Sequence, residues 1–237
     1  MSVDRRRIVA LGAAITALAA FALLTANVVA VGASGLDRAL FRQLYSGESD
    51  WRGGRTPGQS DRVLNGAEPI FHRLAEARVL LLLVVAIVVT LVLVRRVRAA
   101  AFFTAAVSIT VLVSPLKELV ARPSPFPLPH DPSFPSGHAT LSMAVAAGVV
   151  AVLAPGRWRW VAGALGALLV LAVGVAVIAD SGHWPSDVVA GWCLAFAWVA
   201  VLTAVFGHRI DRSPAGDRRL RAQAGSKRRR PGSVETT

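Results

Sequence analysis

Long uninterrupted apolar runs dominate this chain of 237 residues and restrict it to folds that a lipid bilayer can accommodate. A helix needs about 20 apolar residues to cross a hydrocarbon core of ~30 Å. We therefore predict an all-α integral membrane protein whose membrane domain spans 8–206. The six predicted transmembrane helices cover 8–33, 79–94, 99–120, 138–154, 161–179 and 188–206.

The first apolar run follows three consecutive arginines, an arrangement that secretory signal peptides share. The run over 8–33 is longer than the apolar core of a typical signal peptide and has no convincing cleavage site. We therefore interpret it as the first membrane helix, preceded by a short N-terminal segment over 1–7.

The segment 34–78 is polar and forms the predicted outer loop. Within it, Leu36, Leu40, Phe41 and Leu44 recur at helical spacing, which indicates a short amphipathic helix on the membrane surface. A solvated connecting loop is an equally good interpretation of the same residues.

The positive charge is distributed as in a membrane protein. The formal net charge is +12, but no nucleic-acid-binding motif accompanies it, and the basic clusters lie between or beyond the apolar runs. Most of the 26 basic residues fall on one side if the N-terminus is inside, which is the cytoplasmic side by the positive-inside rule. We predict a multi-pass plasma-membrane protein with both termini in the cytoplasm and a disordered basic tail over 207–237. The lone Cys193 excludes an intramolecular disulfide and a cysteine-based metal site.

Ionisable side chains are costly at membrane depth, so those near the ends of the spans are candidates for function. Three groups stand at the outward ends of the third to sixth spans: Lys117 with Arg122, Ser136 with His138, and His183 with Asp187. The predicted topology places all three at one membrane face.

The spacing of His183 and Asp187 puts both on one face of a helix that begins there. A carboxylate can hold one imidazole nitrogen and leave the other free as a base or nucleophile. Pro185 suits the first helical turn, so a capped helix start without catalytic function is the alternative.

The sequence Ser136-Gly137-His138 opens another apolar run. A serine and a glycine at a helix start provide a hydroxyl and unpaired backbone N–H groups, which together can bind an anion. His138 can donate a proton to a leaving group there. An ordinary N-cap explains the serine equally well, and Lys117 either faces a phosphate or extends to the membrane surface.

Together these residues resemble the type 2 phosphatidic acid phosphatase (PAP2) superfamily, also called the lipid phosphate phosphatases. That family has three ordered motifs, Lys-x6-Arg-Pro, Pro-Ser-Gly-His and Ser-Arg-x5-His-x3-Asp. Residues 135–138 match the second motif in full, and His183 with Asp187 match the core of the third. The resemblance covers 117–191 and extends to 8–206 through the six-span arrangement.

The resemblance implies a PAP2-like helical core and a membrane lipid phosphatase with no metal or other cofactor. His183 would attack phosphorus and form a phosphohistidine, Asp187 would orient it, and His138 would protonate the leaving oxygen. Lys117 and the backbone near Ser136 and Gly137 would hold the phosphoryl oxygens. The substrate would be a lipid phosphate or prenyl diphosphate drawn from the bilayer at the extracytoplasmic face.

The chain departs from the family at the motif arginines. Ser124 occupies the arginine position of the first motif, and Ala176 with Val177 occupy the Ser-Arg position of the third. Arg122 is the candidate replacement for phosphate binding, with His130 a weaker one. The alternative function is therefore a catalytically weakened relative that binds a lipid headgroup or another envelope protein. A transporter ranks below both because the centres of the predicted spans carry no ionisable residue.

Overall fold

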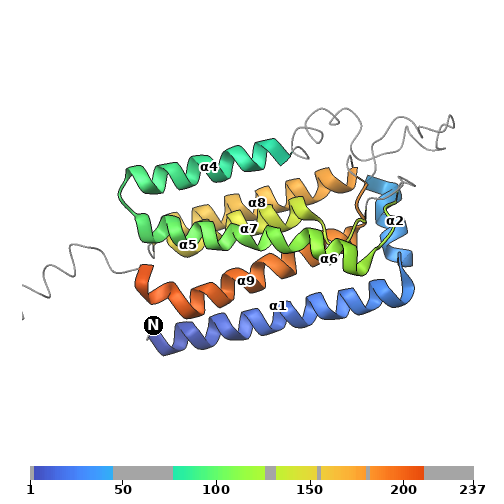
Figure 1. Ribbon diagram of the computed structural model, residues 1–237, viewed down its shortest axis with the longest axis horizontal. Helices are drawn as coiled ribbons and strands as arrows, with labels where there is room; N and C mark the ends of the chain where they lie inside the picture. The colour runs from blue at the N-terminus through green and yellow to red at the C-terminus, as the bar shows by residue number, and fades with distance from the viewer. Residues whose placement is uncertain (1–2, 45–76, 126–131, 154–155, 180–181, 211–237) are drawn as a thin grey trace, which may run out of the picture.

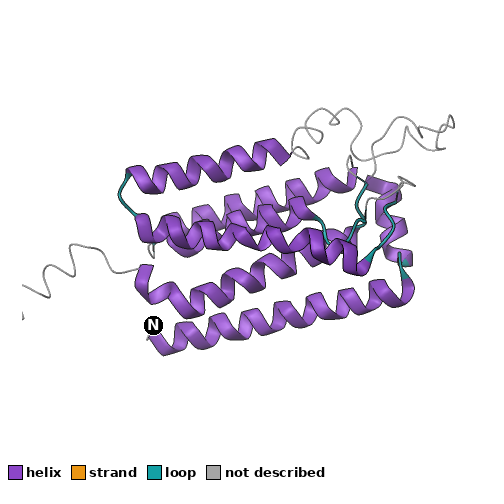
Figure 2. Cartoon of the chain, in the orientation of Figure 1, coloured by secondary structure: helices purple, strands orange, loops and turns teal. Residues whose placement is uncertain are grey.

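The fold is a bundle of long helices that run side by side, with one short helix lying across one end (Figure 1). The computed structural model describes residues 3–44, 77–125, 132–153, 156–179 and 182–210. All regular structure within these ranges is helical (Figure 2), so the all-α prediction is confirmed for them.

The helices follow the predicted apolar runs. They are α1 (Val3–Val31), α4 (Ala77–Leu93), α5 (Val97–Val107), η2 (Ser108–Leu112), α6 (Val113–Val120), α7 (Gly137–Val152), α8 (Arg157–Ala179) and α9 (Pro185–Ile210). Four stretches are long and apolar enough to cross a bilayer: Arg5–Val31, Val97–Val120, Arg157–Ala179 and Pro185–Gly207. With 17 and 16 residues, α4 and α7 are only about 25 Å long at 1.5 Å per residue. Six complete spans therefore stay a prediction.

The third predicted span is one helical path that tightens in its middle into the 3₁₀ segment η2. The hydroxyls of Ser108 and Thr110 donate to backbone carbonyls three residues earlier, at 2.9 and 2.8 Å. Such bonds compete with the regular helical ladder. The path ends at Ala121, whose φ of 48° is left-handed and whose N–H donates to the Lys117 carbonyl. This termination turns the chain across the end of the bundle and directs Arg122 inward.

The short helix across the end of the bundle is α2 (Gly35–Leu44). Its start is a reciprocal cap, in which the Asp37 N–H donates to the Ser34 hydroxyl and the Ser34 N–H donates to the Asp37 carboxylate. Phe41 and Leu44 pack against an apolar cluster that includes residues of α8 and α9. The predicted helix is thus confirmed and the solvated-loop alternative is wrong for these residues. The rest of the outer loop, 45–76, lies outside the described residues.

Close packing of α7 against α9 brings the two polar segments together. At Gly191 an added Cβ would lie 2.7 Å from the Ser136 carbonyl oxygen and 2.9 Å from the Thr140 hydroxyl. Ala139, Ala144, Ala190 and Ala195 are fully buried in the same region. Small side chains are what allow helices in membranes to approach closely. Their placement determines how near the first turns of α7 and α9 can lie.

Gly191→Ala is expected to destabilise the protein by about 1–3 kcal/mol, because the new methyl overlaps backbone atoms of α7 that cannot move freely. Gly207→Ala in the same helix is the matched control, since its Cβ would meet the Thr203 methyl at an ordinary 3.5 Å. Thermal unfolding of the two purified variants in detergent measures the difference. Equal melting temperatures would show that the α7–α9 contact is not tight.

Candidate functional site

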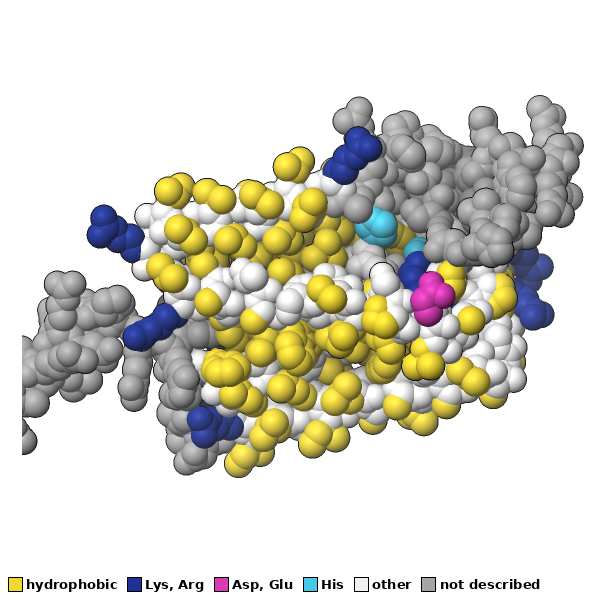
Figure 3. All heavy atoms as spheres, viewed as in Figure 1, with side chains coloured by type: hydrophobic (Ala, Val, Ile, Leu, Met, Phe, Trp, Pro, Cys, Tyr) yellow, Lys and Arg dark blue, Asp and Glu magenta, His cyan; other side chains and the backbone are white. Residues whose placement is uncertain are grey.

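Four chain segments meet at the end of the bundle that carries α2. They are the loop after α6, the first turn of α7, the first turn of α9, and α2 itself. Histidine, basic and acidic side chains gather near this end, whereas hydrophobic side chains cover much of the visible side of the bundle (Figure 3). The three residue groups that the sequence predicted at one membrane face therefore lie at one end of the structure.

His183 lies in the loop just before α9 and faces Asp187 in the first turn of that helix. The predicted shared helical face is wrong, because α9 begins at Pro185 and does not include His183. The His183 Nδ1 lies 3.6 Å from the Asp187 Oδ2, which is longer than a hydrogen bond, and both side chains are buried. Within the described residues this Nδ1 has no hydrogen-bond partner. Hydrogen bonds between catalytic groups are often long without substrate and shorten when it binds. The carboxylate therefore faces Nδ1 of the ring, and Nε2 is the nitrogen that it does not face.

The Asp187 carboxylate also caps the N-terminus of α9. Its Oδ2 accepts a hydrogen bond from the Trp184 N–H at 2.9 Å, as a residue in the first helical turn does in a cap. The helix-cap alternative is therefore correct as a description, but it does not exclude the functional one. The same carboxylate caps α9 and faces His183.

Arg122 is buried between two carboxylates. One terminal nitrogen donates to Asp187 Oδ1 and to the Ser186 hydroxyl, and the other donates to Asp37 Oδ2 and to the Gly32 carbonyl at 2.9 Å each. The guanidinium also lies over the Trp184 ring, 5.7 Å from its centroid. Protein groups thus occupy the terminal nitrogens that were predicted to bind phosphate. A direct Arg122–phosphate contact stays a prediction.

Asp37 is a site residue that the sequence prediction missed. Its carboxylate accepts hydrogen bonds from the Ser186 N–H, the Ser186 hydroxyl and Arg122, each at 2.9 Å. It lies 85 positions before Arg122 and 149 before Ser186 in the chain. The only sequence signal for it was the cap pattern Ser34-x-x-Asp37, which predicts a helix start and no tertiary partner.

Ser136 joins the two polar segments through its backbone. Its N–H donates to the Asp187 carbonyl at 3.1 Å, and its hydroxyl accepts from the Ala139 N–H as the N-cap of α7. The predicted N-cap is therefore confirmed. Since this amide is already bonded, the backbone groups that can face an anion here are those that follow it, beginning with Gly137.

His138 and Lys117 complete the group. His138 is within electrostatic range of both His183 and Lys117, and its Nε2 is buried with no hydrogen-bond partner among the described residues. Lys117, in the last turn of α6, is half-buried. The tertiary structure thus brings two imidazoles, a carboxylate and an ammonium group to the same end of the bundle.

Comparison with known sequences agrees with this geometry, because the profile of the PAP2 superfamily matches residues 98–211. That range contains every polar group described above except the Gly32 carbonyl, Asp37 and its cap. Over this range the chain is similar to the PAP2 superfamily.

Two known proteins are similar to this chain over different extents. An undecaprenyl-diphosphatase of Sulfolobus acidocaldarius is 40% identical over 82 residues, which are 32% of this chain and 34% of that protein. The crystal structure of a transmembrane PAP2-type phosphatidylglycerolphosphate phosphatase from Bacillus subtilis superposes with a TM-score of 0.66 at 19% identity. That superposition covers 84% of this chain and 98% of the other, and it shows a shared fold.

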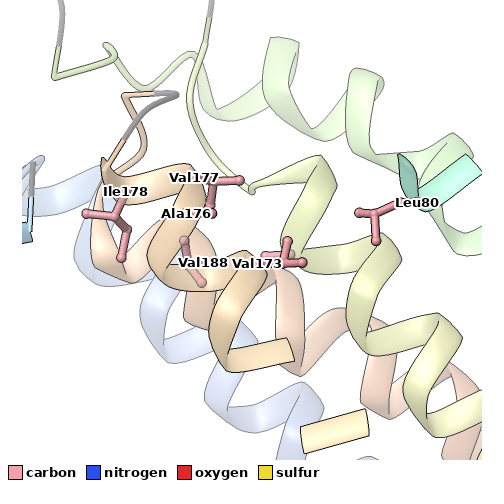
Figure 4. Close-up of a cluster of buried hydrophobic side chains, with 7 residues drawn as sticks. Leu80, Val173, Ala176, Val177, Ile178 and Val188 are labelled. Atoms are coloured by element: carbon pink, nitrogen blue, oxygen red, sulfur yellow. The ribbon is translucent and has the colours of Figure 1, made fainter. Parts of the chain in front are cut away.

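The positions where this chain lacks the motif arginines of the PAP2 family have other structural uses. Ala176 and Val177 are fully buried in an apolar cluster with Val188, between α8 and α9 (Figure 4). Ser124 donates a hydrogen bond to the Gly182 carbonyl at 2.9 Å and so ties the loop after α6 to the loop that holds His183. Of the remaining candidates, His130 lies outside the described residues.

The Asp37 carboxylate should make the free energy of unfolding depend on pH. Burial raises its pKa, but hydrogen bonds from Ser186, Ser34 and Arg122 outweigh burial and bring the pKa below the ordinary 3.8. A group with a lowered pKa stabilises the fold fully above its ordinary value and loses that effect as pH falls through the folded-state pKa.

Asp37→Asn is expected to destabilise the protein by about 2 kcal/mol at neutral pH, because a charged acceptor of several hydrogen bonds is lost. The difference in melting temperature from the parent protein should be constant between about pH 5 and 8 and shrink below about pH 4. A difference that did not change down to about pH 2 would contradict the charged network. Leu36→Asn, at an exposed position of the same helix, is the control and should have little effect at any pH.

Proposed function

We propose that this protein is an integral-membrane phosphatase of the PAP2 superfamily that hydrolyses a lipid phosphate or prenyl diphosphate through a phosphohistidine. The observation that carries the proposal is the convergence of His183, Asp187 and His138 at the end of an apolar helical bundle. The substrate's lipid part enters sideways from the bilayer, and its phosphate reaches the polar end. The names of the two relatives point to the same chemical class of substrate.

In the proposed first step, Nε2 of His183 attacks phosphorus and forms a P–N bond as the bond to the leaving oxygen breaks. Asp187 stabilises the positive charge that develops on the imidazole. His138 transfers its proton to the leaving oxygen, so the lipid departs as an alcohol or as a monophosphate. Water then attacks phosphorus, its proton returns to His138, and inorganic phosphate leaves as His183 is regenerated.

Lys117 and the amides after Ser136 supply the charge complementarity for the phosphoryl oxygens in this scheme. Arg122 acts mainly on the protein side, where it holds Asp187 in the orientation that faces His183. Its charge also lies close to the reacting phosphate. In this scheme one buried arginine and one half-buried lysine supply the positive charge, although the family's other arginines are missing.

His183→Ala is expected to lower phosphate release by at least about 10³-fold, because no other group can form the P–N bond. His138→Ala should cost about 10²–10⁴-fold with a lipid monophosphate, whose leaving alkoxide needs a proton. The loss should be far smaller with p-nitrophenyl phosphate, whose leaving group is already a weak base.

The measurement is inorganic phosphate released from phosphatidate, phosphatidylglycerol phosphate and a prenyl diphosphate, with melting temperatures confirming that each variant folds. Activity that survives His183→Ala would refute the mechanism. An equal effect of His138→Ala on both kinds of leaving group would refute its role as the acid. Lipid binding without phosphate release from any substrate would favour the weakened, headgroup-binding relative, which the positions of Ser124, Ala176 and Val177 motivate.

The proposed topology has six spans in the plasma membrane, both termini in the cytoplasm and the site outside. It is supported by arginines at the end of the bundle opposite the histidines, where α1 and α8 begin. A Cys193→Ser background with Leu36→Cys or Val97→Cys tests it, since both positions are exposed and lie at opposite ends. On intact cells an impermeant maleimide should label only Leu36→Cys. The reverse pattern would place the site in the cytoplasm.

A further inference from the structure

An apolar groove opens between helices at the end of the bundle that the proposed catalytic site does not use. It has a volume of about 1030 Å³ and is lined by residues of α1, α7, α8 and α9. Sites for small organic ligands have volumes of roughly 300–1,000 Å³, so the groove is at the upper limit of that range. Its lining on α7 begins at Met143 and on α9 at Trp192, both deeper in the bundle than His138 and Asp187.

Contacts along α8 show which helices border the groove. Near the site end, Gly174 is in tight contact with Trp192 and Val188 of α9. At Gly166 an added Cβ would meet Ala146 of α7 at 3.0 Å, whereas at Gly163 it would meet nothing within 4 Å. Gly163 therefore faces the groove and does not contact a neighbouring helix.

Three arginines line one end of this otherwise apolar groove, Arg6 and Arg7 from α1 and Arg159 from α8. Both α1 and α8 begin at this end (Figure 1). Helix N-termini carry partial positive charge, so arginines in a first turn or just after it oppose the helix dipole. An anion placed among them would be stabilised by the dipoles and the guanidiniums together.

We propose that the groove binds an anionic phospholipid, with its phosphate among Arg6, Arg7 and Arg159 and its acyl chains between α8 and α9. Charge complementarity selects the occupant, because the long apolar lining excludes a soluble anion and the arginines favour an anionic over a zwitterionic headgroup. The bound lipid fills the groove between these helices and so stabilises the bundle. This site is independent of the proposed hydrolysis.

The test uses the full chain with His183→Ala, so that no lipid is turned over. Native mass spectrometry and melting temperature are measured with added phosphatidylglycerol and, separately, phosphatidylcholine. Phosphatidylglycerol should give a retained one-to-one adduct and a higher melting temperature, whereas phosphatidylcholine should give neither at the same concentration.

Arg6→Gln with Arg159→Gln should weaken phosphatidylglycerol binding by at least about tenfold. Arg5→Gln with Arg157→Gln removes the same charge from the same two helices without touching the groove lining, and should leave binding unchanged. Gly163→Phe should block the groove, while Gly12→Phe, which also faces open space but does not line it, should not.

Three outcomes would overturn the proposal. Equal retention of phosphatidylcholine would show that the headgroup charge is not recognised. Equal weakening by both arginine pairs would indicate only a general surface attraction. Displacement of phosphatidylglycerol by a non-hydrolysable lipid diphosphonate, competitively and one for one, would assign the groove to the substrate. Failure of the proposed phosphatase activity, measured with His183 intact, would change none of these results.

Discussion

The buried ion pairs of Arg122 with Asp37 and Asp187 hold the polar end of this membrane protein together. Burying a guanidinium is expensive unless charged acceptors surround it, and removing one partner leaves an uncompensated charge. Here one carboxylate comes from α2, the other from α9, and the arginine from the loop after α6. Three segments that are distant in the sequence are therefore fixed relative to one another by a single cation.

This constraint determines the orientation of Asp187. Its carboxylate is held by Arg122 on one oxygen and by the Trp184 N–H on the other, and the second oxygen also faces His183. The Asp187 carboxylate thus caps a helix, forms an ion pair and contacts an imidazole at the same time. The cost of disturbing any one of them extends to the other two, which is why hydrogen-bonded networks of this kind behave as units.

The two ends of the bundle carry different charged groups. At the histidine end, carboxylates and cations neutralise each other within the protein. At the opposite end, arginines of α1 and α8 stand at helix starts beside an apolar groove. Apolar side chains and small residues fill the length between them, so hydrophobic contacts position the helices and the charged groups lie toward the two ends.

The sequence by itself determined the helices and singled out the candidate catalytic groups, because both depend on local properties. The length of an apolar run predicts a membrane helix. The spacing of His183 and Asp187 predicted their proximity but not its form, because His183 precedes α9 and contacts Asp187 from the loop. The tertiary structure decided what the sequence could not. It showed that Arg122 donates to Asp37 and Asp187, and that Ala176 and Val177 are buried in apolar packing. Pairings across 85 and 149 residues leave no periodic or compositional trace, since only the folded chain brings those groups within reach of each other.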